Sequence, residues 1–171
     1  LWRIDQRADG YVAAISPLPN PLVSWFGVLA LAVLCWVATS AILRVRRAAT
    51  LAPLRSRAVL TSAFVLTGYL SGWLPWVLTF SRPAVFQFYA VVTTPFAALA
   101  LALVLVAFAA APRSEWLFSS TRIRFSSSPE AVFGRRFSVA IFLCATAALA
   151  AFFWPLWAGM PVELWFYRLH A

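Results

Sequence analysis

The chain has 171 residues, of which 63% are hydrophobic and only 11% are charged. A typical soluble domain is about 45–50% apolar and about 25% charged, so this composition excludes an ordinary soluble protein. It also excludes an intrinsically disordered chain, because disorder requires low hydrophobicity. The net charge of +9 comes from 14 arginines and no lysine, against five acidic residues. The arginines cluster between apolar runs, which is typical of membrane topology signals and not of a nucleic-acid-binding face.

Four uncharged apolar runs follow residues 1–21, and each is long enough for a transmembrane helix, which needs about 20 apolar residues. They are Leu22 to Leu43, Ala58 to Phe80, Ala84 to Ala111 and Phe137 to Trp157. The residues in these runs do not alternate between polar and apolar, which excludes a membrane β-barrel. We therefore predict an all-α membrane protein with four transmembrane helices, connecting loops 44–57 and 112–136, and a tail 158–171.

The arginines predict the orientation of this bundle. Ten of them lie in the two loops 44–57 and 112–136, and four lie on the opposite side. Because cytoplasmic loops carry the excess of Arg and Lys, both arginine-rich loops are predicted to be cytoplasmic. Both termini and the turn Ser81 to Pro83 are then extracytoplasmic, and the protein is a multi-pass protein of the cell membrane. Most tryptophans fall at the predicted outer ends of the spans, where indole rings favour the headgroup level.

Small residues and prolines mark features within the spans. Gly68 and Gly72 form a GxxxG motif, which lets another helix approach closely. Pro75, Pro95 and Pro155 each remove a backbone donor, and we expect each to bend its helix. Residues 113–136, rich in serine and arginine, are typical of a flexible cytoplasmic loop.

The chain offers few catalytic side chains. The four predicted spans contain no Asp, Glu, His or Arg in their interiors, which argues against a proton-coupled transporter or a channel. Cys35 and Cys144 lie in apolar runs and form neither a disulfide framework nor a metal motif. The single histidine, His170, is expected to be an ordinary tail residue. We therefore predict no metal site and no cofactor.

Arg82 differs from the other arginines because it lies in a short outer turn among aromatic residues. The ordinary interpretation is an arginine that extends to the lipid headgroups. The alternative is a clamp for an anionic headgroup, because guanidinium offers bidentate geometry for phosphate.

Several segments resemble the C-terminal membrane region of protein O-mannosyltransferases. Ser16-Pro17-Leu18-Pro19-Asn20-Pro21-Leu22-Val23-Ser24-Trp25 is similar to the start of that region. Gly72-Trp73-Leu74-Pro75-Trp76, Ser81-Arg82-Pro83 and Phe86-Gln87-Phe88-Tyr89 resemble its outer hairpin, and Phe153-Trp154-Pro155-Leu156-Trp157-Ala158-Gly159-Met160-Pro161 resembles its last span. The resemblance extends over essentially the whole chain, and the lysine-free composition is similar to the actinobacterial branch. Eukaryotic relatives carry a histidine in the aromatic run after the arginine, and this chain has none there.

The resemblance implies part of a membrane glycosyltransferase of the GT-C type. Such an enzyme transfers mannose from polyprenyl-phosphate-mannose to Ser or Thr hydroxyls of exported proteins at the outer face. The family's catalytic aspartate lies in an earlier outer loop, so we expect a longer polypeptide and assign no catalytic residue here, in particular neither Asp5 nor Asp9. Arg82 is the predicted ligand of the carrier phosphate, and Asn20, Gln87 and Tyr89 are further predicted substrate-binding residues.

A second hypothesis is a non-catalytic four-helix scaffold or accessory subunit, motivated by the missing acidic residues and by the GxxxG motif. The two hypotheses differ in whether the natural polypeptide carries further spans and an acidic outer loop before residue 1.

Overall fold

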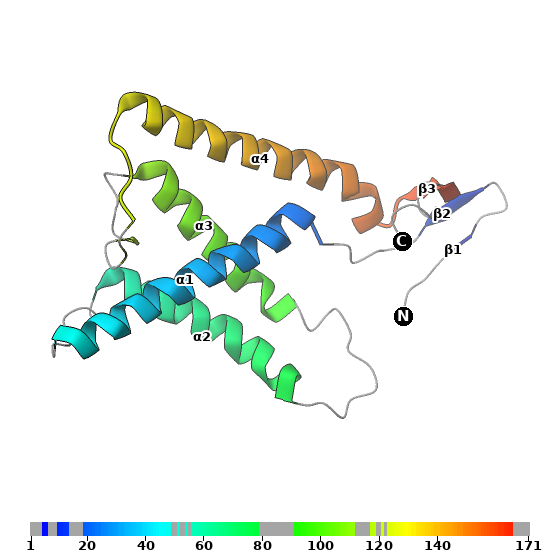
Figure 1. Cartoon of the computed structure of the whole chain (residues 1–171). Coiled ribbons are helices and arrows are strands. Elements are labelled where there is room, and N and C mark those ends of the chain that lie inside the picture. Colours follow the sequence, from blue (N-terminus) through cyan, green and yellow to red (C-terminus); the bar gives the residue numbers. More distant parts are fainter. Residues whose placement is uncertain are drawn as a thin grey trace. The chain divides into compact units, whose positions relative to one another are not determined.

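A computed structural model describes residues 5–6, 10–13, 19–48, 51, 54, 56–78, 91–111, 117–118, 121 and 123–165. Among these residues the protein is mostly helical. Its helices are α1 (Pro21–Ala48), α2 (Arg57–Leu78), α3 (Thr94–Ala110) and α4 (Pro129–Trp157). Its strands are β1 (Asp5–Gln6), β2 (Tyr11–Ala13) and β3 (Pro161–Glu163) (Figure 1). The chain divides into two compact units, residues 1–21 with 141–171 and residues 22–140.

Three of the helices are long and apolar enough to cross a membrane, which suggests a membrane protein. They are Pro21–Arg47, Arg57–Pro75 and Pro129–Trp157, and the shorter apolar helix Thr94–Ala110 accompanies them. In the most apolar 18-residue stretch of α4 only 6% of the residues are buried within the chain. A helix that exposes so much apolar surface is suited to contact with lipid chains.

The core of the unit 22–140 comes from small and medium side chains on α1, α2 and α3. Along α1 the buried residues recur at helical spacing, as in Ala30, Leu34, Val37 and Ala41, so a single stripe of this helix faces inward. Gly27 of α1 lies against Ala97 of α3, where an added Cβ would be 3.5 Å from the Ala97 Cβ.

The GxxxG motif lies in the interface between α2 and α3, which run next to each other (Figure 1). A Cβ added at Gly68 would overlap the ring of Phe96, and one added at Gly72 would lie 3.0 Å from Cγ2 of Thr93. The missing side chains therefore let the start of α3 approach α2 closely, as the motif predicts.

The starts of α3 and α4 differ from the predicted spans. α3 begins at Thr94 and not at Ala84, and Pro95 lies in its first turn. The backbone N–H groups of a first turn have no acceptor within the helix, so proline loses nothing there by lacking one. The expected bend at Pro95 is therefore wrong, because this proline helps to start the helix. Residues 79–90 lie outside the described residues. Pro75 and Pro155 do lie inside α2 and α4.

Helix α4 begins at Pro129, within the predicted loop 112–136. The Ser128 hydroxyl accepts a hydrogen bond from the Ala131 N–H at 3.3 Å, and the Ser128 carbonyl accepts one from the Val132 N–H at 3.0 Å. Ser128 is thus the N-cap, with a proline at the first helical position. Residues 129–136 extend the helix beyond the predicted span 137–157, so the end of the predicted flexible loop is helical.

A small antiparallel sheet joins the two ends of the described chain, in the order β1-β2-β3. Tyr11 pairs with Glu163 and Val12 with Val162, and the Leu164 N–H donates to the Gly10 carbonyl at 3.0 Å. Helix α4 ends at Trp157, Gly159 then adopts φ 64°, and the Met160 N–H donates to the Pro155 carbonyl at 2.9 Å. This is the Schellman pattern, which turns the chain directly from α4 into β3. The sequence pattern predicts only helices, so the sheet is an addition to the predicted fold.

We predict that Gly68→Ala lowers the free energy of unfolding by about 1–3 kcal/mol, because the new methyl group has to displace the Phe96 ring. The matched control is Gly134→Ala, since a Cβ added at Gly134 meets nothing within 4 Å. In the exposed helix α4 this change is expected to stabilise by up to about 1 kcal/mol. SDS unfolding of the full chain from mild detergent, followed by tryptophan fluorescence, measures both. Equal stability of the two variants would contradict the close approach of α3 to Gly68.

Candidate functional site

Of the four predicted substrate-binding residues, only Asn20 is among the described residues. Arg82, Gln87 and Tyr89 lie outside them, so their predicted roles stay predictions. Within the described residues, no group of three or more His, Cys, Asp or Glu side chains is arranged to hold a metal ion.

Asn20 lies immediately before α1 and is half-buried. Its Nδ2 donates a hydrogen bond to the backbone carbonyl of Thr146 in α4, with a donor–acceptor distance of 3.0 Å. The amide therefore connects the residue that precedes α1 to the middle of α4, a long-range contact that sequence spacing did not indicate. This N–H of the Asn20 amide is therefore used within the chain.

The end of the chain near β3 carries exposed indole rings. The Trp165 Nε1–H donates to the Glu163 carboxylate, and Trp154 and Trp165 are both largely exposed. Phe153 stacks on Trp157 with ring centroids 6.3 Å apart. Amphipathic aromatic rings with a polar partner are typical of the headgroup region of a membrane.

Arg135 is the most unusual charged group among the described residues, because its side chain is only 8% exposed. Its Nη2 donates to two backbone carbonyls, at 2.6 Å to Ala111 and at 3.1 Å to Ser126. Its guanidinium carbon lies 5.6 Å from the centroid of the Phe125 ring. Phe125 in turn contacts Phe108 and Phe118 edge-to-face.

The electrostatics of this position favour a cation. Ala111 is the C-cap of α3, so its carbonyl lies at the negative end of that helix, which carries about −0.5 of an elementary charge. The guanidinium satisfies a carbonyl left without a helical partner, and the Phe125 ring adds a cation–π contact. The Arg135 Nε has no hydrogen-bond partner among the described residues. The arrangement fixes the connection between α3 and α4, and it contains no group that transfers a proton.

By its place in the sequence, between two apolar runs, Arg135 is predicted only to be a topology signal. A specific signal for its burial was nevertheless present in the helical spacing. Val132, Arg135, Val139 and Phe142 lie on the less exposed stripe of α4, three or four residues apart. An arginine on such a stripe has to find acceptors, and the end of a neighbouring helix provides them.

Comparison of the chain with protein-family models, with curated proteins and with solved structures found no match. The resemblance to protein O-mannosyltransferases therefore stays a prediction from the quoted sequence segments.

We predict that Arg135→Ala destabilises the protein by about 1.5–3 kcal/mol, the range for hydrogen bonds to a charged group. Its neighbour Arg136 is exposed and provides a matched control. Arg136→Ala removes the same charge and is expected to change stability by less than about 0.5 kcal/mol, as is usual for surface substitutions. SDS unfolding and the rate of trypsin cleavage after Arg124 measure the two effects. If both variants behaved alike, Arg135 would not hold the α3–α4 connection.

Proposed function

We propose that the chain is the membrane-spanning C-terminal part of a GT-C type glycosyltransferase that transfers mannose from polyprenyl-phosphate-mannose to Ser or Thr hydroxyls of exported proteins. Its substrates meet at the extracytoplasmic face of the cell membrane. The activity rests on the sequence segments that resemble protein O-mannosyltransferases, and the pairing of β2 with β3 is the structural observation that supports the required topology.

The pairing of β2 with β3 supports an even number of membrane crossings. Two strands of one sheet lie on the same side of a membrane, so the chain from Ala13 to Pro161 has to cross an even number of times. Three helices are long and apolar enough to cross. The fourth, α3, has 17 residues and a length of about 25 Å at 1.5 Å per residue, close to the hydrocarbon thickness of about 30 Å. Four crossings therefore agree with both the sheet and the composition of α3.

The positions of the described arginines support the orientation. α1 leaves the side of the sheet and has Arg46 and Arg47 in its last turn, and α2 starts at Arg57. If α1 crosses the membrane, these arginines lie on the side opposite the sheet. By the positive-inside rule that side is cytoplasmic, which leaves the sheet and the exposed Trp154 and Trp165 outside.

The proposed reaction forms a bond between an acceptor hydroxyl oxygen and C1 of mannose and breaks the bond from C1 to the carrier phosphate. A base takes the hydroxyl proton, and the polyprenyl phosphate leaves as an anion. Positive charge near the leaving phosphate lowers the barrier, and Arg82 is the proposed source of that charge. We assign no base to this chain.

The alternative of a non-catalytic scaffold was motivated partly by the GxxxG motif. Gly68 and Gly72 already pack against Phe96 and Thr93 of the same chain. The motif is therefore occupied within the protein and by itself gives no support to association with another protein's helix.

We predict that Arg82→Ala in the full-length protein reduces mannose transfer roughly 10- to 100-fold, because a charge-assisted hydrogen bond contributes about 1.5–3 kcal/mol. Transfer is measured in membrane vesicles from radiolabelled polyprenyl-phosphate-mannose to an acceptor peptide. Arg168→Ala is the control, since it removes another arginine from the same predicted face. Near-normal transfer by Arg82→Ala, with equal membrane insertion, would show that Arg82 only extends to the headgroups. Absence of transfer in the unmodified protein would contradict the proposed activity.

A second prediction tests the topology independently of activity. In a background with Cys35→Ala and Cys144→Ala, single cysteines at Tyr11 and at Glu163 are expected to react with a membrane-impermeant maleimide in intact cells. A cysteine at Ser127 is expected to react only after permeabilisation. Labelling of Tyr11→Cys and Glu163→Cys from opposite sides would contradict the even number of crossings, and labelling of both only after permeabilisation would reverse the orientation.

A further inference from the structure

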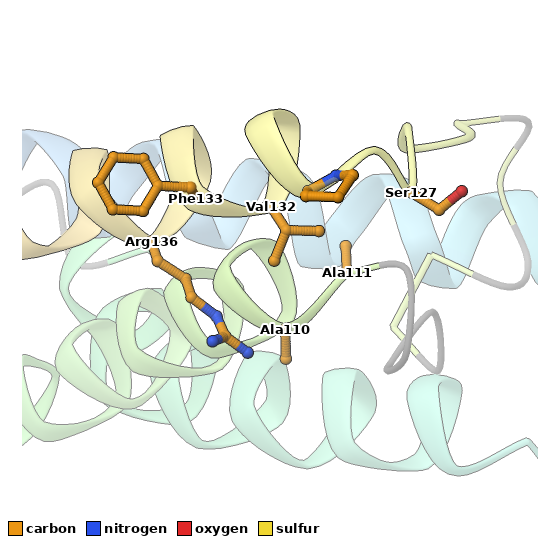
Figure 2. Close-up of a pocket in the computed structure, with 7 residues that line it drawn as sticks. Ala110, Ala111, Ser127, Val132, Phe133 and Arg136 are labelled. Carbon is orange, nitrogen blue, oxygen red and sulfur yellow. The ribbon is translucent and has the colours of Figure 1, made fainter.

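A groove lies within the unit 22–140, between the end of α3 and the first two turns of α4. Its volume is about 550 Å³, and its walls include Ala110, Ala111, Ser127, Val132, Phe133 and Arg136. Figure 2 shows the Arg136 side chain extending from α4 toward Ala110, with Val132 beside it. The walls are thus mainly apolar, with one guanidinium group directed along them.

The two consecutive arginines of α4 have different positions. Arg135 is buried, and its hydrogen bond to the Ala111 carbonyl holds one wall of the groove in place. Arg136 is exposed and lines the groove. No hydrogen bond or ion pair of Arg136 is found among the described residues of this unit. Glu130 lies in the first turn of α4 and is exposed, and it is not among the residues that line the groove.

The surroundings of Arg136 are typical of the boundary between headgroups and lipid chains. The uncharged run Phe137 to Trp157 begins at the next residue. Phe133 is 69% and Phe137 is 55% exposed, and their rings stack with centroids 5.9 Å apart. Phe133 lies three residues before Arg136 and Phe137 one residue after it, so an apolar surface lies close to the charged group. A molecule with both a charged head and an apolar chain requires this combination.

We propose that this groove binds the phosphate headgroup of an anionic phospholipid, with Arg136 as the phosphate ligand and the acyl chain along Phe133 and Phe137. Guanidinium binds phosphate oxygens in a bidentate manner. The stacked phenylalanines favour a lipid over a free phosphate ion. The proposal requires only that α4 meets a bilayer, so it is independent of the proposed transfer reaction and of the outer face.

The test uses native mass spectrometry of the full chain in mild detergent, with phosphatidylglycerol and phosphatidylcholine as probes. The unmodified chain is expected to retain one phosphatidylglycerol that excess phosphatidylcholine does not displace. Arg136→Gln is expected to weaken retention at least about tenfold. Arg46→Gln removes an exposed arginine from the end of α1 and is expected to leave retention unchanged. SDS unfolding of each variant confirms that the fold is intact.

A second variant tests the groove itself. Ala110→Leu narrows it without changing the charge and is expected to reduce retention as well. Unchanged retention in Ala110→Leu would place the lipid elsewhere and overturn the proposal. Equal losses in Arg136→Gln and Arg46→Gln, or no preference for phosphatidylglycerol, would show nonspecific attraction. If millimolar inorganic phosphate displaces the lipid, the site binds a free phosphate ion, and the lipid assignment is wrong.

Discussion

A backbone N–H or C=O group that is removed from water needs a hydrogen-bond partner, and this requirement applies to the ends of these helices. Arg135 illustrates it, because its guanidinium reaches the carbonyl of Ala111 where α3 stops. At the start of α4 the Ser128 hydroxyl performs the corresponding task for an N–H group. At the other end of α4, Gly159 adopts a positive φ, and the Met160 N–H closes the last turn. Each of these three helix ends is thus completed by a particular residue.

The small sheet has a larger consequence than its size suggests. Strands of two or three residues contribute little stability by themselves, since an isolated hairpin is marginal in water. By pairing residues 11–13 with residues 161–163, however, the sheet relates two segments that are far apart in the sequence. In a membrane protein such a pairing constrains the topology. Two hydrogen-bonded strands cannot have lipid between them, so both lie on the same side of the membrane.

Most of the helical content could be predicted from the sequence. The positions at which the helices begin and end could not. Long apolar runs predict α1, α2 and α4, because in lipid a single segment of about twenty residues can satisfy its own backbone N–H and C=O groups only as a helix. The GxxxG packing followed from the absence of side chains at Gly68 and Gly72. The start of α3 was missed because apolar content continues upstream of Thr94, and hydropathy does not register the change made by Pro95. The sheet was missed because alternation cannot be read in strands of two or three residues. Of the predicted site, only Asn20 could be compared, and its hydrogen bond to Thr146 depends on a tertiary contact.

The charged side chains of this chain lie outside the predicted spans. The predicted spans contain no Asp, Glu, His or Arg, so their interiors offer packing surfaces and none of the charged groups that proton relays use. Positive charge is therefore the main chemical feature of the chain. Arg82 is proposed to meet a phosphate that leaves during a reaction. Of the two consecutive arginines of α4, Arg135 donates hydrogen bonds within the fold, and Arg136 lines a groove. Adjacent positions on one helix turn thus separate a structural arginine from one that is available to a ligand, a distinction that net charge alone does not make.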